Sequence, residues 1–248
     1  MSDALRIEKI SKSFGKTTAV DRLSMCVQEG ELVALLGLNG AGKSTLVRML
    51  SCLTPADSGD AWIFGHSVSK NPQAVKACVG VSPQESATAP NLTVYENLEL
   101  MAHLHGLDRT STKARIAELE RIFSLNEVRD KKSKHLSGGW RRRLSIAMAL
   151  VGEPKLLFLD EPTLGLDVLA RRELWRFIEA LKGRVTVVLT THYLEEAEAL
   201  ADRVAVMRAG HLCAYGNVEE LLRMTSTQKL DDAFIALAEK YGKEGAAQ

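Results

Sequence analysis

Hydrophobic and polar positions alternate near the start of the chain in a way typical of β-strands. The alternation covers residues 5–8 and 19–27, and turns are expected near Gly15 and Gly30. The next run, residues 32–36, is apolar at every position. Strands of a parallel sheet are buried on both faces and lose the alternation in this way. The pattern therefore predicts two alternating strands followed by one fully buried strand.

Helical spacing of apolar residues follows over 43–53, and residues 60–64 predict a short strand. A long helical pattern then covers residues 92–126. Residues 156–159, which are all apolar, and 185–189, which are apolar except for Thr186, predict two further buried strands that each follow a helical stretch. Because strands and helices alternate again, we expect an α/β fold with a parallel sheet, interrupted by a helical insertion.

The C-terminal part of the chain predicts a pair of strands, 203–207 and 211–215, and then two short helices within 218–241. Neither an internal repeat nor a low-complexity segment is found. We expect one main unit over residues 1–216 and a short helical tail over 217–248.

Composition is that of an ordinary globular protein, with 248 residues, 46% hydrophobic and 25% charged. The net charge of +1 lacks the basic excess of most nucleic-acid-binding proteins, so no nucleic acid partner is expected. No apolar segment approaches the length of a membrane span, and we expect a cytosolic chain that does not cross a membrane itself. The four cysteines, which form no CxxC pair, are interpreted as reduced thiols: Cys26, Cys52, Cys78 and Cys213.

A phosphate-binding loop stands between the apolar run 32–36 and the following helix. Residues 37–44 fit the pattern GxxxxGK[ST], in which backbone N–H groups and a helix N-terminus surround an anion. Lys43 supplies a mobile positive charge for phosphates, and the Ser44 hydroxyl can bind Mg²⁺. The nucleotide-binding residues expected here are Gly37, Leu38, Asn39, Gly40, Ala41, Gly42, Lys43, Ser44 and Thr45.

Two acidic residues, Asp160 and Glu161, end the apolar run 156–159. Such a strand delivers its last side chains to the sheet edge where ligands of α/β proteins bind. An acid after an apolar strand is usually a turn or capping residue, but a phosphate loop in the same chain favours a functional role. We expect Asp160 to hold Mg²⁺ through water and Glu161 to take a proton from, or orient, an attacking water.

Further motifs give the chain a resemblance to the ABC (ATP-binding cassette) ATPases over about residues 4–216. They are a signature-like segment, a Q-loop glutamine, a D-loop, a switch histidine and an aromatic residue that would stack on adenine. In this sequence they are 136–139, Gln84, 164–167, His192 and Phe14, in the family's order and spacing. Alone, Phe14 and His192 would more often be structural residues, so the constellation carries the identification.

The resemblance implies a P-loop NTPase (RecA-like) core with a parallel sheet, an antiparallel β subdomain and an α-helical subdomain inserted at about 86–145. It implies ATP as the nucleotide, with Mg²⁺ bound by Ser44, Gln84 and Asp160. In the family, two such chains form a head-to-tail homodimer or heterodimer. Each would complete the partner's ATP site with residues that here are Ser137, Gly138, Gly139 and Asp167.

Catalysis in the family's manner would place Lys43, Ser137 and His192 around the γ-phosphate, with Glu161 orienting water and Gln84 reporting nucleotide state. Residues 161–167, 191–198 and 230–234 are similar to the branch of exporters that handle drugs, polysaccharides or ions. This implies separate transmembrane permease subunits and a place on the cytoplasmic face of the inner membrane. A non-transport ABC ATPase that acts on ribosomes or DNA is the alternative.

Two positions depart from the family pattern. Leu38 replaces a common proline, which we expect to be harmless, and Trp140 replaces the usual signature glutamine. Trp140 could stack on a nucleotide across the dimer interface or fill space, and packing is the preferred interpretation. The arginines at 141–143 are expected to form a solvated helix face with interdomain ion pairs rather than a nucleic acid contact.

Overall fold

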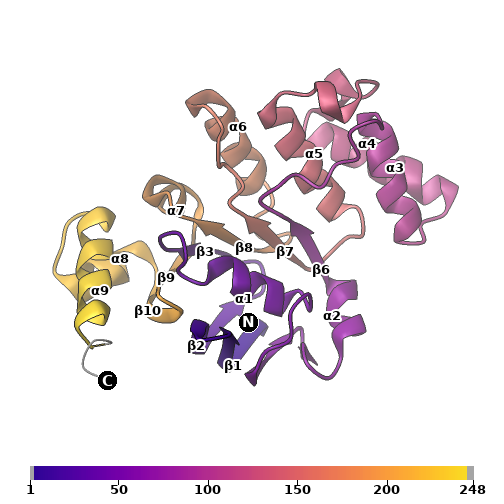
Figure 1. Ribbon diagram of the computed structural model, residues 1–248. Helices are drawn as coiled ribbons and strands as arrows, with labels where there is room; N and C mark the ends of the chain where they lie inside the picture. The colour runs from indigo at the N-terminus through magenta and orange to yellow at the C-terminus, as the bar shows by residue number, and fades with distance from the viewer. Residues whose placement is uncertain (1–2, 245–248) are drawn as a thin grey trace.

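Two β-sheets organise the computed structural model, which describes residues 3–244 (Figure 1). The larger sheet has six strands in the order β10-β9-β3-β8-β7-β6. All its neighbouring pairs are parallel except β9 with β10, which is antiparallel. Its strands are β3 (Leu32–Leu36), β6 (Val79–Ser82), β7 (Leu156–Asp160), β8 (Thr186–Thr191), β9 (Arg203–Arg208) and β10 (His211–Gly216).

The smaller sheet is antiparallel, with the order β2-β1-β4-β5. Its strands are β1 (Asp3–Phe14), β2 (Thr17–Gln28), β4 (Ser58–Ile63) and β5 (His66–Ser67). Alternate residues of β1, including Leu5 and Ile7, are buried, and they share one hydrophobic cluster with α1 (Lys43–Leu50) and one face of the larger sheet. The predicted strands near the start of the chain, the parallel core and the antiparallel subdomain are therefore confirmed.

Helices inserted between β6 and β7 gather at one end of the molecule (Figure 1). Thr93 and Glu96 form a capping box at the start of α3 (Val94–Leu104), and Asp108 caps α4 (Arg109–Ile122). Two short 3₁₀ helices, η1 (Leu125–Val128) and η2 (Ser133–His135), lead into α5 (Gly138–Leu150). The helical stretch predicted at 92–126 is thus present, divided at residues 105–108.

The remaining helices cover the core sheet and form the tail. They are α2 (Pro72–Cys78), α6 (Val168–Glu179), α7 (Leu194–Leu200), α8 (Val218–Thr225) and α9 (Leu230–Glu244). In Figure 1 the tail helices α8 and α9 lie at the far side of the molecule from α3 to α5. Buried Leu230 and Ala233 anchor α9 in the same hydrophobic cluster as β9. Residues 1–2 and 245–248 of the predicted units lie outside the described residues.

The expected solvation of the arginine face is wrong for two of its three members, whereas the expected ion pairing is found at Arg143. Arg142 and Arg143 are only 6% and 5% exposed. Arg143 forms an ion pair with Glu173 of α6, and Arg142 donates to backbone carbonyls. Charge alone suggested a surface helix, whereas α5 is covered on most sides by the core, and each buried guanidinium has a specific partner.

All four cysteines are free, half-buried thiols. Over residues 3–244, no helix combines the length and apolar character needed to span a membrane.

Candidate nucleotide-binding site

The phosphate loop connects the end of β3 to α1 and opens into a cavity of about 540 Å³. Gly42 has φ of +99°, and a Cβ at this position would lie 2.2 Å from the carbonyl oxygen of Ala19. Only glycine therefore fits. No side chain caps the N-terminus of α1, so its first N–H groups are available to an anion. The loop lines the cavity through Asn39, Gly40, Ala41, Gly42, Lys43, Ser44 and Thr45.

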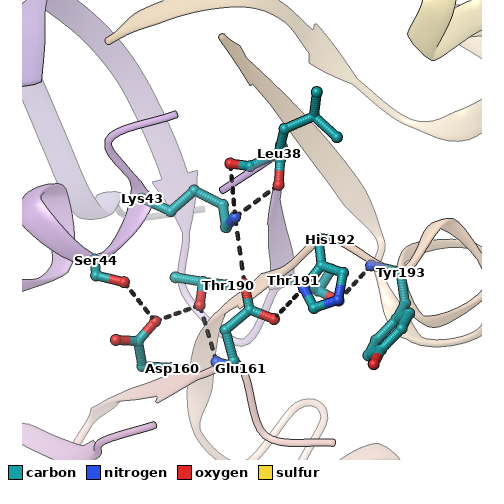
Figure 2. A network of polar contacts seen from close by, with 10 residues as sticks. Leu38, Lys43, Ser44, Asp160, Glu161, Thr190, Thr191, His192 and Tyr193 are labelled. Atoms are coloured by element: carbon teal, nitrogen blue, oxygen red, sulfur yellow. Dashed lines mark hydrogen bonds and ion pairs between the residues drawn. The ribbon is translucent and has the colours of Figure 1, made fainter. Parts of the chain in front are cut away.

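Strand register brings the other polar residues to the same edge of the sheet. Leu36 pairs with Thr191, and Asp160 pairs with Thr190, so β3, β7 and β8 end side by side. Glu161 and His192 follow directly after two of these strands and line the cavity. Figure 2 shows the resulting network around Lys43, Asp160, Glu161 and His192.

The Lys43 ammonium is buried and held by three oxygens. Nζ donates to the carbonyls of Gly37 at 2.6 Å and Leu38 at 3.3 Å, and lies 3.3 Å from Oε1 of Glu161 (Figure 2). Its side chain is 6% exposed. The ion pair with Glu161 neutralises a charge that would otherwise be costly to bury. An incoming phosphate would offer Lys43 a second anionic partner in the same place.

Glu161 links this lysine to the histidine. Its Oε2 lies 2.7 Å from Nδ1 of His192, while its backbone N–H donates to Oγ1 of Thr190 at 2.9 Å. The residue has φ of +48°, a left-handed conformation that is uncommon for residues other than glycine. Strain of this kind is retained where surrounding contacts fix it, often at functional sites. The buried Glu161 carboxylate therefore lies between the Lys43 ammonium and the His192 imidazole.

Asp160 is half-buried and lies beside Ser44. Its Oδ1 accepts from Ser44 Oγ at 3.1 Å and from the Thr190 hydroxyl (Figure 2). These are the hard oxygen donors that Mg²⁺ prefers. Across residues 3–244 no group of three or more His, Cys, Asp or Glu side chains could hold a metal alone. The donor set therefore fits Mg²⁺ held by few protein oxygens together with substrate phosphates.

Comparison with known proteins agrees with this geometry. The ABC transporter family model matches residues 20–164. This chain belongs to the ABC transporter family. It is 42% identical to the Daunorubicin resistance ATP-binding protein DrrA3 of Streptomyces coeruleorubidus over 245 residues, covering 98% of this chain and 76% of that protein. It is 39% identical to the Linearmycin resistance ATP-binding protein LnrL of Bacillus subtilis (strain 168), covering 88% and 70%.

Solved structures of ABC transporter proteins show the same fold. An ATP-binding subunit of an ABC transporter superposes with a TM-score of 0.84 at 29% identity, covering 94% of this chain and 99% of that chain. The expected P-loop NTPase fold and ABC identity are thereby confirmed, and the chain is an ATP-binding protein of the ABC transporter type.

Not all residues expected from the ABC pattern meet in one place. Gln84, from the loop after β6, lines the cavity with Lys43, Glu161 and His192. Phe14 is 54% exposed at the end of β1 and is not among the cavity-lining residues, although Thr17 to Ala19 of the adjoining β2 are. Leu38, within the loop, is 62% exposed, and like Gly37 it is not among the cavity-lining residues.

The signature end of the ABC unit, which we define as Ser137, Gly138 and Gly139, lies elsewhere. Ser137 is the N-cap residue of α5, and its side chain caps no backbone N–H. Ser137 and Gly138 are exposed, and none of the three residues lines the cavity. A Cβ at Gly139 would be 3.4 Å from that of Ala170 in α6, so the signature end lies against the D-loop helix.

Asp167 of the D-loop has a local partner. Its carboxylate accepts from the backbone N–H groups of Leu169 and Ala170 and caps α6. This is the ordinary role of an aspartate before a helix, and it satisfies two N–H groups that have no partner within the helix. The side chain is nevertheless at the surface, beside the exposed Val168 and Leu169.

Trp140 packs within the chain, in line with the preferred interpretation from the sequence. Its indole joins the main hydrophobic cluster, and the Arg143 guanidinium lies 4.3 Å from the ring centroid. The same guanidinium lies 4.8 Å from the Phe177 ring and pairs with Glu173, both on α6. Trp140 thus helps to fix the signature helix α5 to α6.

Sequence reasoning missed Thr190, which binds both acids of the site, and it missed the contribution of residues 17–19 to the cavity. A polar residue directly after the apolar residues 187–189 was the available signal for Thr190. Residues 17–19 carry no such signal, because only folding of the antiparallel sheet over α1 brings them to the loop.

Proposed function

We propose that this chain is the ATP-hydrolysing subunit of an ABC exporter and acts with separate transmembrane permease subunits. The observation that carries the proposal is Glu161, a buried carboxylate that contacts both Lys43 and His192 inside the phosphate-loop cavity. Nucleotide binding alone needs the loop and the lysine. A strained acid next to a histidine supplies what water attack on a γ-phosphate requires in addition.

Lys43 would leave the Gly37 and Leu38 carbonyls for the β- and γ-phosphates when ATP binds. Glu161, released from the ammonium, would orient the water and accept its proton, while His192 would steady both Glu161 and the γ-phosphate. Gln84, at the joint with the helical insertion, would sense whether the γ-phosphate is present. Mg²⁺ held by Ser44, Asp160 and Gln84 would neutralise charge on the phosphate oxygens.

The site is completed, in this proposal, by another ATPase subunit. The signature end is exposed and lies outside the cavity, so within one chain it does not reach the phosphate loop. In a head-to-tail homodimer or heterodimer the partner's Ser137, Gly138, Gly139 and Asp167 would close over the ATP, and Phe14 would stack on the adenine. ATP would hold the dimer shut, and hydrolysis would let it open.

Export is favoured over import because the relatives named for daunorubicin and linearmycin resistance match nearly the whole chain. We place the protein on the cytoplasmic face of the membrane, held there by its permease. We further propose that residues 1–216 form the ATPase unit, with a helical subdomain at about 86–145, and that residues 217–248 form an appended tail.

Copurification tests this assignment. The tagged chain, expressed with its neighbouring genes and extracted from membranes in mild detergent, should retain a stoichiometric membrane subunit. The complex should release phosphate from ATP, and EDTA should abolish the release. A chain that stays with ribosomes, or a complex that binds ATP without turnover, would contradict the proposal.

A further inference from the structure

The inner face of the signature helix α5 carries buried polar residues where apolar ones would be expected. Arg142 is 6% exposed and Ser145 is 4% exposed. Residues three apart in a helix lie on the same face, so both point to one side of α5. That side faces β6 and the loop that begins at Pro83.

Arg142 is bonded to the backbone that leads into the Q-loop. Nη1 donates to the Pro83 carbonyl at 2.7 Å, and Nη2 donates to the Gln84 carbonyl at 2.5 Å. One helical turn later the Ser145 and Ser82 hydroxyls are hydrogen-bonded at 2.9 Å. Three successive residues, 82–84, are therefore tied to one face of α5. The planar guanidinium has donors in fixed positions and can bond two neighbouring carbonyls at once, whereas a lysine ammonium is a single compact charge.

Burying this guanidinium is costly. Burial lowers the pKa of Arg142, although the group stays protonated, and the charges that act most strongly on it in the opposite sense are those of Asp160 and Glu196. Its hydrogen bonds go to carbonyls and hold backbone in place. A hydrophobic residue of similar size often stabilises a fold as well as a buried charge does. The cost of burying Arg142 is explained if the function of the protein requires residues 83–84 to be held in a fixed position.

Both ends of this connection belong to nucleotide-binding motifs. Gln84 lines the phosphate-loop cavity, and Ser137, five residues before Arg142, stands at the start of α5. Hydrogen-bond networks and rigid secondary elements such as helices can carry energetic coupling between two sites. A movement of the Gln84 backbone would thus shift the signature end as well.

We propose that Arg142 is a positioning residue that couples the Q-loop to the signature helix, so that nucleotide sensed at Gln84 aligns Ser137 for the partner subunit. The inference rests on the proposed ATPase function and deepens it. Arg142 does not contact ATP in this proposal. It acts through two backbone carbonyls and the rigidity of α5.

Arg142→Gln tests the coupling, with Arg142→Lys as the conservative variant and Arg121→Gln, on the exposed face of α4, as the control. We expect Arg142→Gln to keep the wild-type melting temperature within a few degrees and to bind ATP to the monomer with unchanged Kd. Its kcat should fall about 10- to 100-fold, because small misplacements of aligned groups cost rate rather than affinity. Arg142→Lys should recover part of the loss, and Arg121→Gln should behave as wild type.

Hydrogen exchange gives a readout besides activity. In the Glu161→Gln variant, MgATP should protect residues 83–88 and residues 137–141 from exchange. In the double variant with Arg142→Gln, residues 83–88 should stay protected and residues 137–141 should lose their protection. Unchanged kcat with both segments still protected would overturn the coupling. So would a loss of kcat that merely follows lost folding or lost ATP affinity. If Arg142→Gln does not fold, Arg142→Lys, which keeps the charge but lacks the fork, decides by the same measurements. Wild-type protein without turnover would instead count against the ATPase function.

Discussion

The two parts of the proposed nucleotide site, the phosphate-loop cavity and the signature end, differ in how completely one chain builds them. Around the phosphate loop, Lys43 and Glu161 are each about 6% exposed and bonded to their neighbours. At the signature end, Ser137 and Gly138 lie on the surface, and the Ser137 side chain caps no N–H of its own helix. The first region, which we call the preorganised half, holds its charged groups in place before a ligand binds, which favours binding and catalysis. The second presents helix N–H groups without a side-chain cap at the surface, as the proposed contact with another subunit's nucleotide requires.

Lys43→Ala should have the largest effect, because it removes the cation of the preorganised half. The Glu161 carboxylate would then be left buried without its ammonium partner and would repel phosphate. We expect ATP affinity and kcat/KM to fall about 100-fold or more. Fluorescent-nucleotide titration and phosphate release measure both. Near-normal affinity would show that the loop backbone alone binds ATP.

Ser137→Glu should separate the two halves. A carboxylate at the exposed N-cap of α5 would repel the partner's nucleotide but lies outside the phosphate-loop cavity. We expect ATP affinity of the monomer to stay within about threefold, while turnover falls about 100-fold. The matched control is Lys134→Ala, because Lys134 is exposed. Ser133 is less suitable, since its buried side chain donates to the Ala89 carbonyl. Equal loss of binding and turnover would place the signature end in the same chain's site.

Trp140→Gln restores the residue common in the family and tests whether the packing of α5 matters. Loss of the stacking between Trp140 and Arg143 should lower the free energy of unfolding by about 1 kcal/mol. Turnover should survive within about threefold, since the indole packs in the hydrophobic cluster rather than in the cavity. Thermal unfolding measures the change in stability, and phosphate release measures turnover. An inactive but folded variant would assign Trp140 to the nucleotide.

The smallest effect concerns Glu196, a fully buried acid behind the site that accepts a hydrogen bond from the Trp175 indole at 3.1 Å. Burial raises its pKa above the ordinary value of 4.5. The folded protein thus holds this proton more tightly than the unfolded chain. The associated stability is complete below the ordinary pKa and is lost as the pH rises through the folded value.

Glu196→Gln, which is permanently neutral, should therefore raise the melting temperature relative to wild type at pH 8 and lose this advantage near pH 4.5. A scan of melting temperature against pH for both proteins provides the test. A variant that is less stable at pH 8 would mean that the ionised carboxylate is itself stabilising.

Much of the preorganised half could be predicted from sequence because its residues follow apolar strands at fixed spacing. Lys43 and Asp160 are placed by parallel strands whose burial is visible as unbroken apolar runs, and His192 follows a strand with an apolar centre at 187–189. Arg142 could not be foreseen, since a run of three arginines looks solvated until the fold buries one against two carbonyls. Tertiary contacts of this kind depend on how α5 lies on β6, and no local pattern encodes that.

The mass of Glu161→Gln in solution with MgATP tests most directly whether the preorganised half needs the signature end of another subunit. Replacement of the carboxylate by an amide removes the base but retains the side-chain volume, so ATP should bind and persist. Light scattering should show a dimer with MgATP and a monomer with ADP, and Ser137→Glu in the same chain should restore the monomer with ATP. A Glu161→Gln protein that stays monomeric with bound ATP, or that turns over normally, would contradict this account.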